Sequence, residues 1–181
     1  MEASRPPPSL VPKNLIVYIG FMLEDVRAYL SRWNRDRDII EMENSTATVE
    51  LAAAALGVIP ARIAKSISLK SADGGAMMIV TAGDMKLDNR KFKDRFTIKA
   101  KMLSPEDALH YTGHAIGGVC PFALPQGVEV YLDSSMRRFE TMFPACGSGN
   151  SAIELTLADL EEYSHSRGWV DVCVSSVPAA Q

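Results

Sequence analysis

The most constraining feature of this 181-residue sequence is a pair of segments with strand-like patterns, separated by a short turn. Residues 65–70 (KSISLK) alternate between polar and apolar types, whereas residues 76–82 (AMMIVTA) are apolar almost throughout. Alternation indicates a strand with one buried face, and a continuous apolar run indicates a strand buried on both faces. The intervening Asp73-Gly74-Gly75 is typical of a tight turn. Together these segments predict an antiparallel hairpin at the centre of a sheet.

Helix signals occur in five further segments, at residues 22–34, 49–56, 88–96, 104–113 and 156–164. In the first segment, apolar residues recur at the spacing of three and four that places them on one face of a helix. The second follows a run of hydroxyl residues that can cap a helix, and Gly57 can end it. Ser104 and Pro105 are typical of a helix start, and Gly113 of a helix end.

Besides the hairpin, we expect short strands at residues 38–42, 97–102, 127–133, 141–145 and 151–155. Helices and strands follow one another without a repeating strand–helix–strand rhythm. This arrangement favours an α+β fold with a mixed, largely antiparallel sheet.

Length and composition fit one domain, because 47% of the residues are hydrophobic and a chain of this size can bury a substantial core. We expect residues 1–20 to form a partly disordered N-terminal lead, residues 21–173 the single domain, and residues 174–181 a C-terminal tail. The apolar run at residues 15–23 (LIVYIGFML) is too short to span a bilayer, which takes about 20 residues. We expect it to form an edge strand or to pack against the domain, and we expect no membrane association.

Charge is distributed unevenly along the chain. Nineteen basic and 22 acidic residues give a net charge of −3, which argues against a protein that coats nucleic acid non-specifically. Residues 84–101 nevertheless hold seven basic and three acidic residues. This local excess suits a polyphosphate partner such as an RNA end, although a solvated helix face explains it almost as well. The candidate RNA contacts are Lys86, Arg90, Lys91 and Lys93.

The three cysteines, Cys120, Cys146 and Cys173, lie 26 and 27 residues apart. This spacing matches neither a disulfide framework nor a Cys-x-x-Cys site, so it favours a reducing cytoplasm and thiols that act as small buried apolar groups. His110 and His114 lie near Cys120, but Gly113 is expected to end the helix between the two histidines, and no HExxH pattern is present. We therefore expect no metal and no cofactor.

Two features could carry chemistry. Residues 114–122 (HAIGGVCPF) form an irregular loop whose glycines can aim consecutive backbone N–H groups at an acyl oxygen, although a tight turn without a ligand is the commoner outcome. Lys65 begins the alternating strand directly after an apolar turn. If its side chain points inward it needs an anionic or carbonyl partner, and if it points outward it is merely solvated.

Several short motifs occur in a fixed order along the chain. They are STATVELAA at 45–53, RIAKS at 62–66, AGD at 82–84 followed by Leu87-Asp88, Gly113-His114 with GGVCPF at 117–122, YLD at 131–133, and Gly147-Ser148 with Asn150. Over residues 22–172 this ordered set resembles the YbaK/EbsC-type aminoacyl-tRNA deacylases, relatives of the editing domain inserted in bacterial prolyl-tRNA synthetase. The resemblance implies a mixed sheet curled into a partial barrel and flanked by helices.

What the resemblance implies for function is hydrolysis of the ester between an incorrect amino acid and the 3′-terminal ribose of a transfer RNA, without metal, cofactor or covalent intermediate. The family theme is a small amino acid such as alanine or cysteine on tRNA(Pro), with prolyl-tRNA synthetase as a further partner. The residues it implies for catalysis are Lys65, Gly117, Gly118 and Asp133, and those for substrate binding are Thr46, Val119, Pro121, Ser148 and Asn150.

In this interpretation Lys65 positions the terminal nucleotide, and the backbone amides around residues 117–119 hold the acyl carbonyl. The alternative is a non-catalytic relative that binds transfer RNA or a synthetase. The amino acid, the transfer RNA, the residues lining the amino-acid pocket and the oligomeric state stay open at this stage.

Overall fold

The hairpin predicted from the sequence forms the centre of the fold. The computed structural model describes the backbone of residues 15–177 and the side chains from residue 22 onward. Strands β2 (Ile63–Lys70) and β3 (Ala76–Ala82) pair antiparallel from Ala64 opposite Ala82 to Lys70 opposite Ala76. Every residue of β3 is buried, which confirms its position inside the sheet. In the turn, Gly74 has a φ of +86°, a conformation that glycine adopts without strain.

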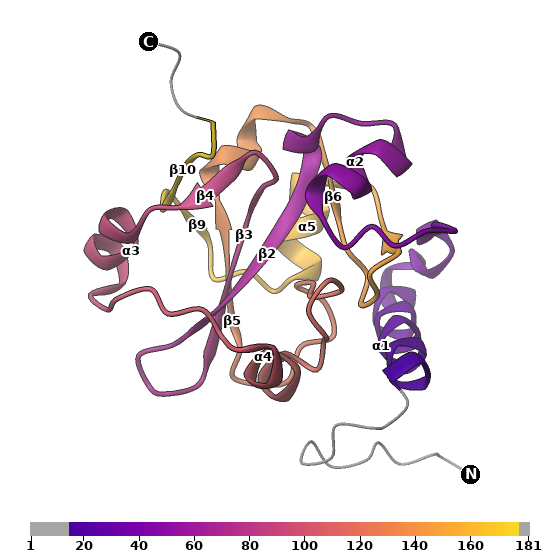
Figure 1. Ribbon diagram of the computed structural model, residues 1–181, viewed down its shortest axis with the longest axis horizontal. Coiled ribbons are helices and arrows are strands. Elements are labelled where there is room, and N and C mark those ends of the chain that lie inside the picture. The colour runs from indigo at the N-terminus through magenta and orange to yellow at the C-terminus, as the bar shows by residue number, and fades with distance from the viewer. Residues whose placement is uncertain (1–14, 178–181) are drawn as a thin grey trace.

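A six-stranded mixed sheet, in the order β8-β6-β2-β3-β5-β9, forms around this hairpin (Figure 1). The outer strands are β5 (Glu129–Asp133), β6 (Thr141–Pro144), β8 (Leu155–Thr156) and β9 (Trp169–Val170). Two smaller pairs join β1 (Ile40–Glu41) to β7 (Ser151–Ala152) and β4 (Met85–Leu87) to β10 (Cys173–Ser175). Among the described residues, four strand pairings are antiparallel and three are parallel.

The helices lie within one residue of the expected bounds, except that the first spans residues 15–30 and not the expected 22–34. They are α1 (Leu15–Leu30), α2 (Val49–Leu56), α3 (Asn89–Phe96), α4 (Pro105–Thr112) and α5 (Leu157–Tyr163), together with short 3-10 segments η1 (Ser31–Trp33), η2 (Asp36–Asp38), η3 (Pro60–Arg62) and η4 (Ser134–Arg138). Hydroxyls of Thr48, Ser104 and Thr156 accept hydrogen bonds from the first-turn amides of their helices. Gly57 and Gly113 end α2 and α4 with positive φ.

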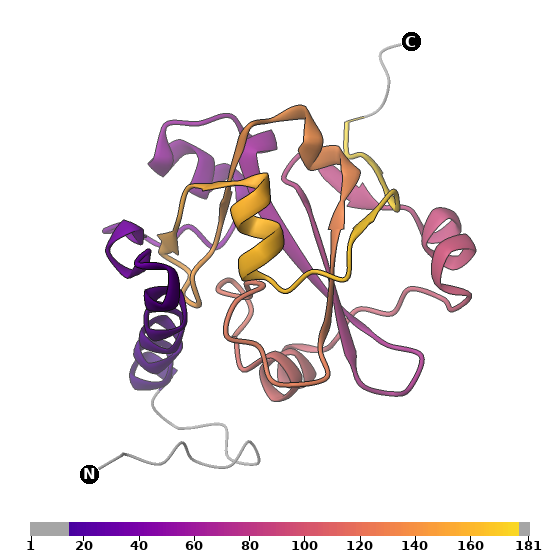
Figure 2. The same cartoon turned by 180° about the vertical axis from the view of Figure 1, so that it is seen from behind.

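Two hydrophobic clusters lie on opposite faces of the sheet. The larger one packs Val26 and Leu30 of α1 and Leu160 of α5 against sheet residues such as Met78 and Leu132. The smaller one packs Phe92 of α3 with Ile67, Leu69, Ile79 and Val172. Helix α5 lies behind the sheet in Figure 1 and in front of it in Figure 2, whereas α2 lies on the opposite side. The α+β class and the partially closed, helix-flanked sheet are thus confirmed.

Four expected elements differ in the structure. Residues 15–23 start α1, so the expectation of an edge strand there is wrong. Residues 97–102 form a loop, because Thr97 ends α3 with a φ of +61° and the rest of the segment makes one isolated bridge, between Met102 and Leu69. The strand expected at 151–155 is interrupted and forms β7 and β8, and β10 extends to Ser175, two residues into the expected tail.

The N-terminal lead expected at residues 1–20 lies outside the described residues up to residue 14, and residues 15–20 belong to α1. Within the described part of the chain, none of the helices combines the length and apolar character that a bilayer crossing requires.

Candidate functional site

A pocket of about 240 Å³ opens where β2 lacks a neighbouring strand. On this edge β6 pairs with β2 only at Ile63 and Ala64. The chain returns to the same edge further along, where Leu103 N donates to Ser68 O at 3.0 Å and Lys70 N donates to Lys101 O at 2.9 Å. Between these contacts the edge of β2 is open at residues 65–67, and the pocket fills that opening.

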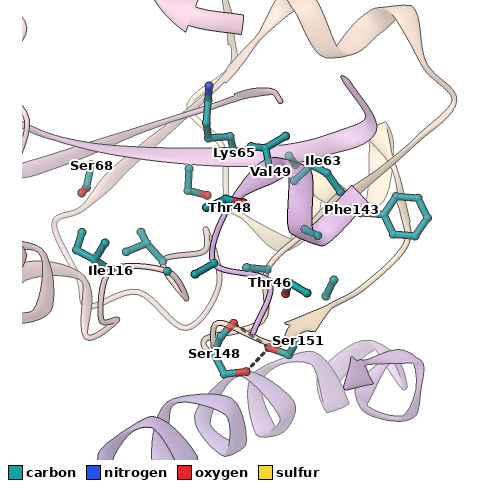
Figure 3. Close-up of a pocket in the computed structure, with 18 of the residues that line it drawn as sticks. Thr46, Thr48, Val49, Ile63, Lys65, Ser68, Ile116, Phe143, Ser148 and Ser151 are labelled. Carbon is teal, nitrogen blue, oxygen red and sulfur yellow. Dashed lines mark hydrogen bonds between the residues drawn. The ribbon is translucent and has the colours of Figure 1, made fainter. Parts of the chain in front are cut away.

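Loops at residues 45–48, 101–103, 114–122 (the glycine loop) and 147–151 border the open edge (Figure 3). The residues that line the pocket are Thr46, Ala47, Thr48, Val49, Ala52, Leu56, Ile63, Ala64, Lys65, Ser66, Ser68, Met102, Leu103, Ile116, Gly117, Val119, Phe143, Ala145, Ser148, Ser151 and Ala152. Lys65 is the one charged residue among them. The other polar groups are hydroxyls, so the pocket can hold a largely uncharged group and orient it by hydrogen bonds.

The wall formed by β2 presents main-chain groups to the pocket. Successive residues along a strand point their N–H and C=O groups to alternate edges, so every second residue points to the same edge. Because Ser68 O and Lys70 N bond to the loop on the edge away from β3, the N–H and C=O of Ser66 point to this same edge. The Ser66 hydroxyl is buried and has no hydrogen-bond partner within the described residues. Ser66 therefore presents its main-chain N–H and C=O at the pocket, whereas its hydroxyl is buried.

Lys65 lines the pocket with its stem, but its ammonium points away from Thr46, Ser148 and Ser151 (Figure 3). It shares a face of β2 with Ile67, and Nζ donates a hydrogen bond to the carbonyl oxygen of Met85. The side chain is half-buried. Desolvation lowers the pKa of Lys65, and attraction to the carboxylates of Glu50 and Asp84 partly opposes that shift. The ammonium is thus held by a single carbonyl at the edge of the pocket.

The glycine loop contributes two free amides. Among the described residues, the N–H groups of Gly117 and Val119 make no hydrogen bond, and both residues line the pocket. Gly117 has a φ of +95°, and a Cβ there would lie 3.2 Å from the Cβ of Ala47. The backbone conformation thus favours glycine, and a Cβ would also press against the 45–48 segment.

Gly118 was implied in catalysis, but in the structure it has a packing role. Its N–H donates to Ala115 O at 3.0 Å, closing a turn, so this amide is not available to an acyl oxygen. A Cβ on Gly118 would lie 2.8 Å from the carbonyl carbon and oxygen of Gly147. Gly118 therefore allows the glycine loop to pack directly on the 147–151 turn.

The 147–151 turn is fastened to the segment before α2. Asn150 Nδ2 donates to Met42 O at 2.9 Å, and Thr46 Oγ1 donates to Gly149 O at 3.0 Å. Ser148 Oγ lies 2.9 Å from Asn150 Oδ1 and 2.7 Å from Ser151 Oγ. Ser148 and Thr46 line the pocket, whereas Asn150 holds the turn from outside it.

Asp133 and Pro121 lie outside the pocket wall. Both are buried, and neither lines the pocket. Asp133 Oδ1 accepts a hydrogen bond from Ser135 N at 3.0 Å, and Oδ2 accepts one from Val172 N at 2.9 Å. With an exposure of 1%, the Asp133 carboxylate holds η4 and the segment before β10 in place and does not reach the pocket.

The basic residues expected to contact RNA lie on β4 and α3, away from the pocket lining. Lys86, Arg90 and Lys93 are exposed. Lys91 is already engaged, because Nζ lies 2.7 Å from Asp171 Oδ1 and donates to Cys173 O at 3.3 Å. The pair between Arg90 and Asp94 is long, at 3.9 Å, and almost fully solvated.

The thiols and histidines take no part in the pocket. All three cysteines are buried and unbridged, as expected, and burial raises the pKa of Cys120 and of Cys173 to about 12. His114 is buried beside Cys120, with Nε2 2.8 Å from Phe122 O, whereas His110 is exposed on α4. Within the described residues, no three His, Cys, Asp or Glu side chains gather as a metal site would require.

Sequence reasoning missed several residues of the pocket, above all Ser66, Ser68, Met102, Ile116 and Phe143. Ser66 and Ser68 are the small polar residues of the alternating strand, and this signal could have marked them as facing an opening rather than the core. Nothing local distinguishes Met102, Ile116 or Phe143, because their role depends on loops that meet only in the folded chain.

Several known proteins are similar to this chain in sequence or in structure. The chain is 54% identical over 151 residues to YwhH, an uncharacterized protein of Bacillus subtilis (strain 168), which covers 83% of this chain and 96% of that protein. It is 26% identical over 129 residues to the proline–tRNA ligase of Bacillus licheniformis, covering 71% of this chain but only 22% of the ligase.

A crystal structure of a candidate trans-editing enzyme for prolyl tRNA synthetase superposes with a TM-score of 0.77, at 24% identity, over 85% of this chain and 98% of that one. This likeness shows a shared fold. The model of the aminoacyl-tRNA editing domain matches residues 43–163, which include α2, the hairpin, the glycine loop and the 147–151 turn. The chain therefore belongs to the aminoacyl-tRNA editing domain family.

Proposed function

We propose that the protein is a free-standing hydrolase that cleaves the ester of mischarged aminoacyl-tRNA, with a small amino acid such as alanine or cysteine on tRNA(Pro) as its substrate. The observation that carries this proposal is the pocket itself, in which a glycine loop with two amides free of hydrogen bonds lines an open strand edge bordered by Lys65. The sequence relationship to a proline–tRNA ligase supports tRNA(Pro) as the carrier. We expect a cytoplasmic location, with prolyl-tRNA synthetase as a further partner.

The amino-acid side chain would occupy the apolar end of the pocket. Val49, Ala52 and Leu56 of the α2 region meet Ile63 and Phe143 there and form a small apolar cluster. An uncharged side chain suits this lining, and a larger cognate residue would clash with it. Exclusion by clash discriminates better than a tighter fit, since one methylene is worth only about 1–3 kcal/mol.

The polar side of the pocket can recognise the reacting ester. The carbonyl oxygen of Ser66 faces the open edge and can accept a hydrogen bond from the α-ammonium of the amino acid. The amides of Gly117 and Val119 can donate to the oxygen that becomes negatively charged when water attacks the ester carbon. One such donor supplies about 3 kcal/mol of transition-state stabilisation. The C–O bond to the ribose then breaks, and the ribose oxygen takes up a proton.

Lys65 would bind the terminal phosphate or ribose and fix the position of the ester. To do so, its ammonium must leave the carbonyl of Met85 and turn toward the pocket. One hydrogen bond to a neutral carbonyl is a modest restraint, and a phosphate is a stronger acceptor for an ammonium. Asp133 and Asn150 would act as positioning residues, since each holds a neighbouring segment by hydrogen bonds to the main chain.

The competing proposal is a catalytically silent relative that binds transfer RNA or a synthetase. The two free amides of Gly117 and Val119 favour the enzyme, because a binding module has no need for unsatisfied donors around an acyl site. The presence of both Lys65 and the glycine loop also favours the enzyme.

A deacylation panel tests the proposal. tRNA(Pro) charged with alanine, cysteine or serine, and with proline as the cognate control, is incubated with pure protein, and release of each amino acid is followed over time. We expect release of at least one small amino acid and retention of proline. Tight binding of the charged transfer RNA with no release of any amino acid would favour the silent relative.

A further inference from the structure

Two large apolar side chains stand exposed at the mouth of the pocket. Met102 and Ile116 are 68% and 60% exposed, and they are among the three most exposed large apolar residues in the described part of the chain. Both line the pocket, on different loops. Exposure of large apolar side chains is unfavourable in water, and apolar side chains that line a pocket together with a few polar groups are typical of a ligand-binding site.

The backbone holds each of these side chains outward. Met102 pairs with Leu69 at the end of β2, and hydrogen bonds from Lys70 N and from Leu103 N fasten the chain on both sides of it. Ile116 lies in the turn closed by the bond from Gly118 N to Ala115 O, with Gly117 in the left-handed conformation next to it. Ile116 is thus a central residue of a hydrogen-bonded turn, and its side chain is exposed. The exposure is thus fixed by the fold.

We propose that Met102 and Ile116 form an apolar clamp for the nucleobase of the terminal nucleotide of the substrate. This inference rests on the proposed function, because it places the base at the mouth when the ester lies in the pocket. A nucleobase has two apolar faces and a polar rim, so it binds between apolar side chains while its edges stay in contact with water. The thioether of methionine is polarisable and binds well against aromatic rings.

The surrounding charge agrees with a nucleotide rather than with a protein segment or a lipid. Lys99 and Lys101 precede Met102 on the same loop, are exposed, and form no ion pair with any described residue. They could neutralise the phosphates that follow the terminal base. The amino-acid side chain does not compete for the clamp, because the apolar cluster at the other end of the pocket accommodates it.

The test compares binding of two small probes. One is 3′-alanylamino-3′-deoxyadenosine, an amide that resists hydrolysis, and the other is the same alanyl amide on a ribose without a base. Affinities are measured by isothermal titration calorimetry for wild type, Met102→Ala, Ile116→Ala and the double variant. We expect wild type to prefer the adenosine probe, and each single variant to bind it at least about fivefold more weakly, with the abasic probe unaffected.

Ile59→Ala is the matched control, since Ile59 is 57% exposed and does not line the pocket. It should bind both probes like wild type. The clamp is refuted if the Met102 and Ile116 variants keep the wild-type preference for the adenosine probe, or if wild type binds neither probe.

The deacylation panel separates this inference from the proposed function. If wild type releases amino acid from transfer RNA while Met102→Ala and Ile116→Ala do so with an unchanged KM, the clamp fails and the hydrolase stands. If wild type releases none but binds the adenosine probe through both side chains, the clamp stands and the hydrolase fails.

Discussion

The pocket and the α3 face differ most in charge. Lys65 is the one charged residue among those lining the pocket, whereas α3 and its flanks expose Lys86, Arg90, Lys93 and Arg95. The pocket has free amides, hydroxyls and apolar walls, which discriminate between ligands by shape and hydrogen bonding. A row of exposed cations attracts any polyphosphate and does not distinguish one nucleic-acid sequence from another. The difference suggests that the pocket selects the substrate and the α3 face supplies general affinity.

The largest expected effect comes from removing the single charge of the pocket. Lys65→Ala should abolish nearly all deacylation, because the substrate would be both less tightly held and misplaced relative to the amides of Gly117 and Val119. Lys65→Arg should also fail, since the broad guanidinium cannot occupy a point-charge position. The measurement is kcat/KM on mischarged transfer RNA. A folded Lys65→Ala protein that keeps more than about a tenth of the rate has lost only ~1.4 kcal/mol, which contradicts this role.

The free energy of unfolding shows whether a loss of activity at Lys65 reflects a loss of folded protein. Desolvation lowers the pKa of Lys65, so at neutral pH the charged ammonium opposes folding. This penalty is present below the lowered pKa and disappears as the pH rises toward the value of an unfolded lysine. Lys65→Met should therefore keep or increase the free energy of unfolding at pH 7. A clear decrease in urea titrations would show that the contact with Met85 supports the fold.

The next effect concerns the shape of the pocket. Gly118→Ala would place a methyl group 2.8 Å from the main chain of Gly147, so the glycine loop and the 147–151 turn would have to separate. Overpacking of this kind costs about 1–3 kcal/mol, and we expect both a lower Tm and a lower deacylation rate. Gly149→Ala is the matched control, because a Cβ there meets nothing closer than 3.8 Å. Equal behaviour of the two variants would show that loop contact does not shape the pocket.

Local signals in the sequence predict most of the fold. Caps such as Thr48 and Ser104 and the terminating Gly57 and Gly113 act within a few residues, and the helices they delimit are confirmed. The strand predicted at 97–102 is wrong, because Thr97 and Ile98 favour β structure only as a local tendency. In the fold this segment has a partner only at Met102, so it remains a loop.

The roles of the pocket residues are harder to predict from the sequence than the helices and strands. Periodicity cannot fix the direction of Lys65, because that depends on Met85, which lies 20 residues away and offers its carbonyl. It also cannot separate Gly117 from Gly118, one with a free amide and the other with a packing role. The resemblance to the editing domains is confirmed by the family match, whereas the roles of individual residues stay predictions.

The α3 face should show a smaller, salt-dependent effect. Lys86→Glu combined with Lys93→Glu should weaken binding of transfer RNA and reduce the slope of log affinity against log salt by about 1 for each phosphate that is no longer neutralised. Lys91→Ala is the matched control, because its ammonium is already neutralised by Asp171 at 2.7 Å. Filter binding at several salt concentrations gives the slopes. An unchanged slope in the double variant would mean that the α3 face is only a solvated surface.

The smallest effect is expected from the thiols and from metal removal. None of Cys120, Cys146 and Cys173 lines the pocket, and burial raises the pKa of each, so none is a thiolate at neutral pH. The triple change to Ala should retain most of the deacylation rate in protein that remains folded, and treatment with a chelator should leave the wild-type rate unchanged. Single-turnover rates before and after chelation, with zinc added back, measure both. A rate that falls on chelation and returns with zinc would contradict metal-free chemistry and would point back to the region of His110, His114 and Cys120.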